Sequence, residues 1–243
     1  MRAHEFLTER WTKQTVKNYF DIKKQPEITA QDIKVSNPMP GCVVLKYKTI
    51  PDLTRSFFRL AEYYESGRTG RNKQVSLPDF LDQWVDRQGN VDYLKFWDGF
   101  NITDRAFRDW AKSARPFSKA EQVMVDVVKQ ATKGMSKFCI IGVGSTDKDT
   151  EKHEMFHAKY YLDDNFRAAA DKLLKDNATD SAVKTIEKIL RTKLDYKNHV
   201  EEEVAAYLYA GSQLKLVFGI NPRDLVKKFQ QLDKDSALQA AGK

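Results

Sequence analysis

His153-Glu-Met-Phe-His157 places two histidines four residues apart in a stretch with helical character. Residues four apart in an α-helix lie on one face, with Cβ atoms about 5–6 Å apart. Both imidazole rings can therefore present a nitrogen to one metal ion, at the roughly 2.0–2.1 Å that zinc takes from histidine. The chain has 4 histidines, and two of them share this spacing. The spacing predicts a metal site on a helix, and the alternative is a chance pair on a helix face.

The residue between the histidines that matters for chemistry is Glu154. Together the three residues form the H-E-x-x-H arrangement of zinc peptidases. A bound metal lowers the pKa of a water molecule toward about 7 and polarises a carbonyl oxygen. Glu154 can reach such a water, accept its proton and pass it to the leaving amine. The motif therefore predicts Zn2+ as cofactor, Glu154 as general base, and a peptide or protein as substrate.

A catalytic zinc site takes three protein ligands, so a third is required. The metzincin continuation, with a further histidine soon after His157, is absent. We expect Glu203 to be the third ligand, because it heads an apolar stripe whose small residues, such as Ala206, let two helices approach closely. Glu202 and His199 remain alternatives. The alternative to metal binding is that these acidic residues simply begin a helix, where the helix dipole favours negative charge.

An oxyanion that forms during hydrolysis needs a hydrogen-bond donor besides the metal. Tyr207 lies one turn beyond Glu203 and is the expected donor, whereas Tyr160 and Tyr161, one turn beyond His157, are alternatives. Packing is the more common role of such tyrosines, and it is the main alternative for each of the three.

The rest of the chain predicts an α+β fold, mostly helical with a small sheet. Apolar, β-branched segments at 42–50 and 138–143 predict strands, and Ser118-Lys-Ala-Glu121 is a capping-box pattern at a helix start. Residues 1–41 are expected to be an N-terminal helix and a Pro-rich linker, followed by one metallohydrolase domain over 42–243. Residues 97–101 are expected to be a loop. Helices are expected at 3–20, 51–66, 76–87, 103–114, 164–175, 180–193, 199–216 and 222–232.

Several segments together resemble an uncharacterised group of bacterial and phage proteins that carry one H-E-x-x-H motif. They are Phe57-Phe-Arg-Leu-Ala-Glu-Tyr-Tyr-Glu-Ser66, Trp97-Asp-Gly-Phe-Asn-Ile102, Phe138-Cys-Ile-Ile-Gly-Val143, the histidine segment 150–162 and Glu203-Val-Ala-Ala-Tyr-Leu208. The resemblance implies a zincin-like fold with a gluzincin-type site, and the last segment is also similar to small gluzincins that cleave phage-type repressors. Phe156 departs from the small residue that many members carry, and the gap from His157 to Glu203 is longer than in thermolysin-like enzymes.

Composition limits the other function classes. The formal net charge is +7, but 41 basic and 34 acidic residues are mixed along the chain, so nucleic-acid binding through Arg68, Arg71 and Lys73 is an alternative that is not favoured. A second alternative is a non-catalytic, virion-associated or binding protein that keeps the zincin-like fold. No apolar run approaches the roughly 18 residues of a membrane span. The 2 cysteines lie in apolar segments, so we expect free thiols and a cytoplasmic location, or a virion for a phage-encoded chain.

Overall fold

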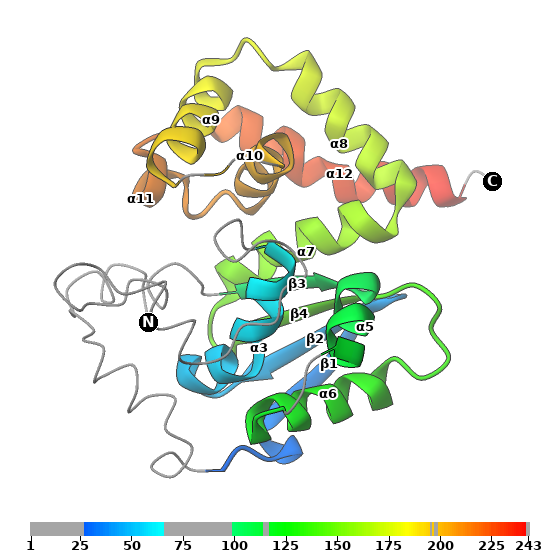
Figure 1. The fold of residues 1–243 in the computed structure, drawn as a ribbon. Coiled ribbons are helices and arrows are strands. Elements are labelled where there is room, and N and C mark those ends of the chain that lie inside the picture. Colours follow the sequence, from blue (N-terminus) through cyan, green and yellow to red (C-terminus); the bar gives the residue numbers. More distant parts are fainter. Residues whose placement is uncertain (1–26, 66–98, 114–116, 195, 197–198, 242–243) are drawn as a thin grey trace, which may run out of the picture. The chain divides into compact units, whose positions relative to one another are not determined.

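The structure, a computed structural model, describes residues 27–65, 99–113, 117–194, 196 and 199–241 (Figure 1). It consists of two compact units, Met1–Asp147 and Lys148–Lys243. The described residues are mostly helical with one small four-stranded sheet, which confirms the predicted α+β class. Among these residues, none of the helices combines the length and apolarity needed to cross a membrane. The helices expected at 3–20 and 76–87, and the basic residues Arg68, Arg71 and Lys73, lie outside the described part.

The sheet belongs to the first unit and has the strand order β1-β2-β4-β3. Its strands are β1 (Ile33–Met39), β2 (Cys42–Tyr47), β3 (Gly99–Thr103) and β4 (Cys139–Gly144). The two inner strands, β2 and β4, run parallel, and each pairs antiparallel with an edge strand. Every residue of β4 is buried. Both inner strands coincide with the apolar segments from which strands were predicted.

The two edge strands correct the predictions. Residues 21–41 were expected to be a linker, but residues 33–39 form β1, which turns into β2 through Gly41 with a φ of 78°. Residues 97–101 were expected to be a loop, yet the described part of that segment begins β3. An edge strand pairs on one side only, and β1 exposes its five residues from 34 to 38. Because one side stays open, β1 needs no apolar pattern and tolerates Pro38.

The described part of the first unit also contains a short 3-10 turn, η1 (Ala30–Asp32), and the helices α3 (Ile50–Glu65), α5 (Asp104–Ser113) and α6 (Lys119–Ala131). The predicted capping box is confirmed: Ser118 Oγ accepts a hydrogen bond from the backbone N–H of Glu121, and the Glu121 carboxylate accepts one from the backbone N–H of Ser118. Glu121 is fully buried, and its charge is met by Arg59, whose Nε donates at 2.6 Å. The pair connects α3 to α6.

The second unit contains helices only, within the residues described. They are α7 (Lys148–Leu162), α8 (Asp164–Asp176), α9 (Ser181–Lys193), α10 (Val200–Ala210), α11 (Leu214–Phe218) and α12 (Arg223–Ala241). Helix α10 packs against α7, α9 and α12, around a core of its own that includes Phe156, Phe166 and Phe229. The single helix expected over 199–216 is wrong, because the chain turns at Gly211, with a φ of 80°, and separates α10 from α11.

A hydrogen-bond network joins three of these helices. Lys159 Nζ on α7 donates to the Tyr209 hydroxyl on α10 at 2.8 Å and to Asp233 Oδ1 on α12 at 2.6 Å. The Tyr209 hydroxyl in turn donates to Asp233 Oδ2 at 2.7 Å. The network connects α7, α10 and α12, the first two of which carry the candidate site.

Candidate metal centre

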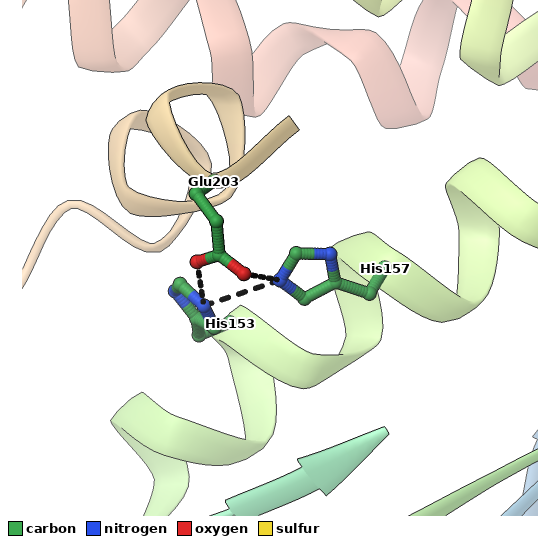
Figure 2. Close-up of side chains that lie close together, drawn as sticks. All are labelled: His153, His157 and Glu203. Carbon is green, nitrogen blue, oxygen red and sulfur yellow. Dashed lines mark hydrogen bonds and ion pairs between the residues drawn. The ribbon is translucent and has the colours of Figure 1, made fainter. Parts of the chain in front are cut away.

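The two histidines of the H-E-x-x-H motif lie on one face of α7, one turn apart, with ring centroids 5.0 Å apart. Opposite them, the first turn of α10 supplies Glu203. Figure 2 shows the Glu203 carboxylate pointing from its helix toward both rings. The structure therefore brings together the three side chains that the sequence predicted as metal ligands, and all three belong to the second unit.

The three donor groups lie at the corners of a small triangle, in which the Glu203 carboxylate, with its two oxygens, is one corner. The two Nε2 atoms of His153 and His157 are 3.2 Å apart. Glu203 Oε2 lies 3.4 Å from Nε2 of His153, and Oε1 lies 3.5 Å from Nε2 of His157. Two ligand atoms bound at about 2.0–2.1 Å to a tetrahedral ion are roughly 3.3–3.4 Å apart. The three distances, two of which reach different oxygens of the Glu203 carboxylate, are close to this separation, and the group could hold a metal ion.

Two buried polar atoms of this group lack hydrogen-bond partners within the described part of the chain, Glu203 Oε2 and His153 Nδ1. An unsatisfied buried polar atom costs about 1–3 kcal/mol. Glu203 Oε2 makes only an ion-pair contact, at 3.4 Å from Nε2 of His153, and a cation held by the group would satisfy it. The residues present therefore fit a metal ion by their spacing, by the chemistry of their donors and by the unmet acceptor.

Glu202, the alternative third ligand, occupies a different position. Its Oε1 lies 2.8 Å from Nδ1 of His157, the ring nitrogen that faces away from the triangle. His199, the other alternative, is 69% exposed and its Nδ1 is 3.9 Å from Glu202 Oε2. The structure brings neither residue into the donor group of His153, His157 and Glu203.

Charge within the group couples its titrating residues. Burial of the ring would lower the pKa of His157, but the charge of Glu203, the hydrogen bond to Glu202 and the charge of Glu154 together raise it to about 10. Burial would raise the pKa of Glu203, but His157 and His153 lower it below its usual range. Without a metal, the raised pKa therefore keeps His157 protonated at neutral pH.

The two residues predicted for catalysis lie next to the donor group. Glu154 is half-buried on α7 and close enough for its charge to act on His157. The ring of Tyr207 packs edge to face on His153. Of the alternative tyrosines, Tyr160 donates its hydroxyl to Asp171 at 2.7 Å, and Tyr161 is half-buried on α7.

One residue of the site has a role that sequence reasoning missed. Glu202 appeared only as a rival ligand, whereas the structure makes it the partner of the far nitrogen of His157. Consecutive residues of a helix point about 100° apart, so Glu202 and Glu203 can reach different sides of one ring. No signal in the sequence separates these two roles, because both require an acid in the same helical turn.

No protein-family model matches the sequence, and no curated protein or solved structure shows significant similarity to it. The resemblance to H-E-x-x-H proteins of bacteria and phages stays a prediction. The zincin-like fold that this resemblance implies stays a prediction as well.

Proposed function

We propose that His153, His157 and Glu203 bind zinc and that the protein is a zinc-dependent metallopeptidase. The observation that carries the proposal is the convergence of the three donor groups: the two Nε2 atoms are 3.2 Å apart, and each lies 3.4 or 3.5 Å from one oxygen of the Glu203 carboxylate. Two imidazoles and one carboxylate are a donor set of catalytic zinc sites, which keep a fourth position for water. Imidazole nitrogens favour zinc over magnesium or calcium, which prefer oxygen ligands.

The residues around the triangle supply the remaining functions of hydrolysis. Zinc, when bound, lowers the pKa of water and polarises the scissile carbonyl. Glu154, which follows His153 on α7, accepts a proton from the attacking water and delivers it to the leaving amine. The Tyr207 hydroxyl donates a hydrogen bond to the carbonyl oxygen as negative charge develops there. The substrate is a peptide or an unfolded protein segment.

The first test of this proposal is metal content. Protein purified without chelator should contain about one zinc per chain by elemental mass spectrometry, as the three-ligand site requires. His153→Ala and Glu203→Ala should each lose it, whereas His199→Ala should keep it, because His199 lies outside the donor group. A wild-type chain that takes up no zinc, even when zinc is added, would overturn the proposal.

The second test is turnover. The zinc-loaded protein should cleave members of a mixed peptide library, detected as new termini by mass spectrometry. Glu154→Gln should keep its zinc but lose cleavage, since an amide cannot accept the proton. Cleavage that survives in Glu154→Gln would remove Glu154 as the base. Zinc binding without cleavage would favour the non-catalytic alternative.

A further inference from the structure

The side chain of Glu202 meets His157 on the side of the ring that faces away from the metal ligands. Its Oε1 lies 2.8 Å from Nδ1, a normal length for a charge-assisted hydrogen bond. A carboxylate can only accept, so when His157 is neutral its proton must sit on Nδ1 and be donated to Glu202. The lone pair of Nε2 then faces His153 and Glu203.

We propose that Glu202 is a positioning residue that sets the tautomer and the orientation of His157 for metal binding. The inference rests on the proposed zinc site and adds to it a residue that is not a ligand. A histidine that binds a metal through one nitrogen is commonly oriented by a carboxylate on the other, and this partner also makes the ring a stronger ligand.

The position of Glu202 on α10 strengthens the argument. Glu202 and Glu203 are consecutive, and together they address both nitrogens of one ring: Glu202 at Nδ1, at 2.8 Å, and Glu203 at Nε2, at 3.5 Å. One helical turn thus fixes the ring of His157 at both edges. Rotation of the ring about its χ2 bond would break the hydrogen bond and turn the lone pair away from the metal.

Burial makes this contact stronger than an exposed ion pair. The side chains of His157 and Glu202 are only 11% and 23% exposed, and a hydrogen bond to a charged group is stronger where water is scarce. The contrast within the site is informative, because Nδ1 of His153 has no hydrogen-bond partner in the described residues. Its ring is instead held by Tyr207. The two ligand histidines are therefore oriented by different means.

Glu201 provides a matched control. It lies in the same turn of α10, has the same side chain, and is 71% exposed, where it accepts a hydrogen bond from Arg191 at 3.2 Å. Glu201→Gln removes the same charge at nearly the same distance along the helix but touches no ligand. Any difference between the two substitutions therefore reports the contact with His157 rather than the charge of the helix terminus.

The test measures zinc affinity by competition with a chromophoric chelator, for the wild type, Glu202→Ala, Glu202→Gln and Glu201→Gln. We expect Glu202→Ala to bind zinc roughly 10–100-fold more weakly. Glu202→Gln should lose less, because its amide oxygen still accepts the hydrogen bond without the charge, and Glu201→Gln should match the wild type. Circular dichroism of the metal-free variants establishes whether they fold. If Glu202→Ala does not fold, Glu202→Gln still tests the proposal.

A second readout is the tautomer itself, from long-range nitrogen–proton NMR correlations of the zinc-loaded wild type. The His157 ring should carry its proton on Nδ1, and in Glu202→Ala this signal should broaden or exchange. Zinc affinity in the Glu202 variants equal to that of the wild type, or a proton on Nε2 of His157 in the zinc-loaded wild type, would overturn the positioning role alone. Absence of zinc from the wild type would overturn the proposed function as well, so the two failures are distinguishable.

Discussion

Tyr207 meets His153 edge to face, with ring centroids 4.6 Å apart and an angle of 62° between the ring planes. A second edge-to-face contact joins the same tyrosine to Phe218, at 4.8 Å. The aromatic ring of Tyr207 therefore supports His153, a proposed ligand, regardless of what its hydroxyl does. This separation allows the structural and the catalytic contributions of one residue to be measured independently.

Tyr207→Phe keeps the ring and removes the hydroxyl. We expect zinc affinity to be unchanged and kcat for peptide cleavage to fall roughly 10²-fold, the typical effect of removing one oxyanion donor. Tyr160→Phe is the control, since the Tyr160 hydroxyl is engaged with Asp171, and it should leave kcat as in the wild type. If Tyr207→Phe keeps the wild-type kcat, the Tyr207 hydroxyl has no catalytic role and the residue serves only in packing.

The raised pKa of His157 predicts a pH dependence for the metal-free protein. The folded state binds this proton up to a pKa of about 10, whereas the ordinary value is 6.5. Protonation therefore favours the folded state, and its contribution is complete below about pH 6.5 and lost as the pH rises toward 10. Glu203, with its lowered pKa, acts in the opposite direction and loses its contribution as the pH falls into the acid range.

We therefore expect the urea midpoint of the metal-free protein to decrease between pH 6.5 and 10. The same measurement on His157→Gln should show a smaller decrease, because the titrating group has been removed. In the presence of excess zinc the trend should reverse, since the metal needs the neutral ring and binds more tightly as protons become scarce. Identical slopes for the wild type and His157→Gln would contradict this coupling.

A close approach in the first unit predicts a destabilising substitution. A Cβ atom at Gly142 in β4 would lie 2.7 Å from Cε2 of Phe57 and 3.0 Å from Cδ1 of Leu53. Gly142→Ala should lower the free energy of unfolding by about 1–3 kcal/mol through overpacking. Gly144→Ala is a graded control in the same strand, because it would meet only the end of Ile50, at 3.1 Å. An additional Phe57→Leu substitution should recover part of the loss.

The network of Lys159, Tyr209 and Asp233 predicts a further effect on stability. Tyr209 is only 3% exposed, and its hydroxyl exchanges hydrogen bonds with both charged partners. Tyr209→Phe should lower the free energy of unfolding by about 1 kcal/mol. Lys172→Met removes an exposed ion pair with Asp176 on α8. It should change the free energy of unfolding by at most about 0.5 kcal/mol. Chemical denaturation of the zinc-loaded chains measures both.

Strand prediction succeeded or failed according to position in the sheet. The inner strands β2 and β4 pair on both sides and are buried, so the sequence shows them as continuous apolar runs. The edge strand β1 exposes its central residues, and Pro38 makes it look like a linker. In β3, Gly99 and Asn101 are residues that favour turns, and only the pairing with β4 holds them in a strand. Such strands are stabilised by pairing with segments distant in the sequence, and local sequence pattern does not contain that information.

The donor group could be anticipated for a different reason. A spacing of four on a helix fixes the relation between His153 and His157 without any tertiary information. Glu203 could be proposed because its helix carries small residues on the same face, and the structure brings it to the two rings. The contact of Glu202 with His157 could not be predicted, because it depends on which edge of the His157 ring α10 approaches, and packing of α10 on α7 decides this.

The division of the chain at residue 148 has a consequence for the evolution of the proposed metal site. The second unit, Lys148–Lys243, has its own hydrophobic core and contains the whole site. The site consists of the three proposed donors, Glu202 next to His157, and Tyr207 next to His153. The proposed metal centre is contained in one helical unit, so its residues can be inherited, duplicated or transplanted together. Its chemistry can then be paired with new flanking sequence without redesign of the ligands.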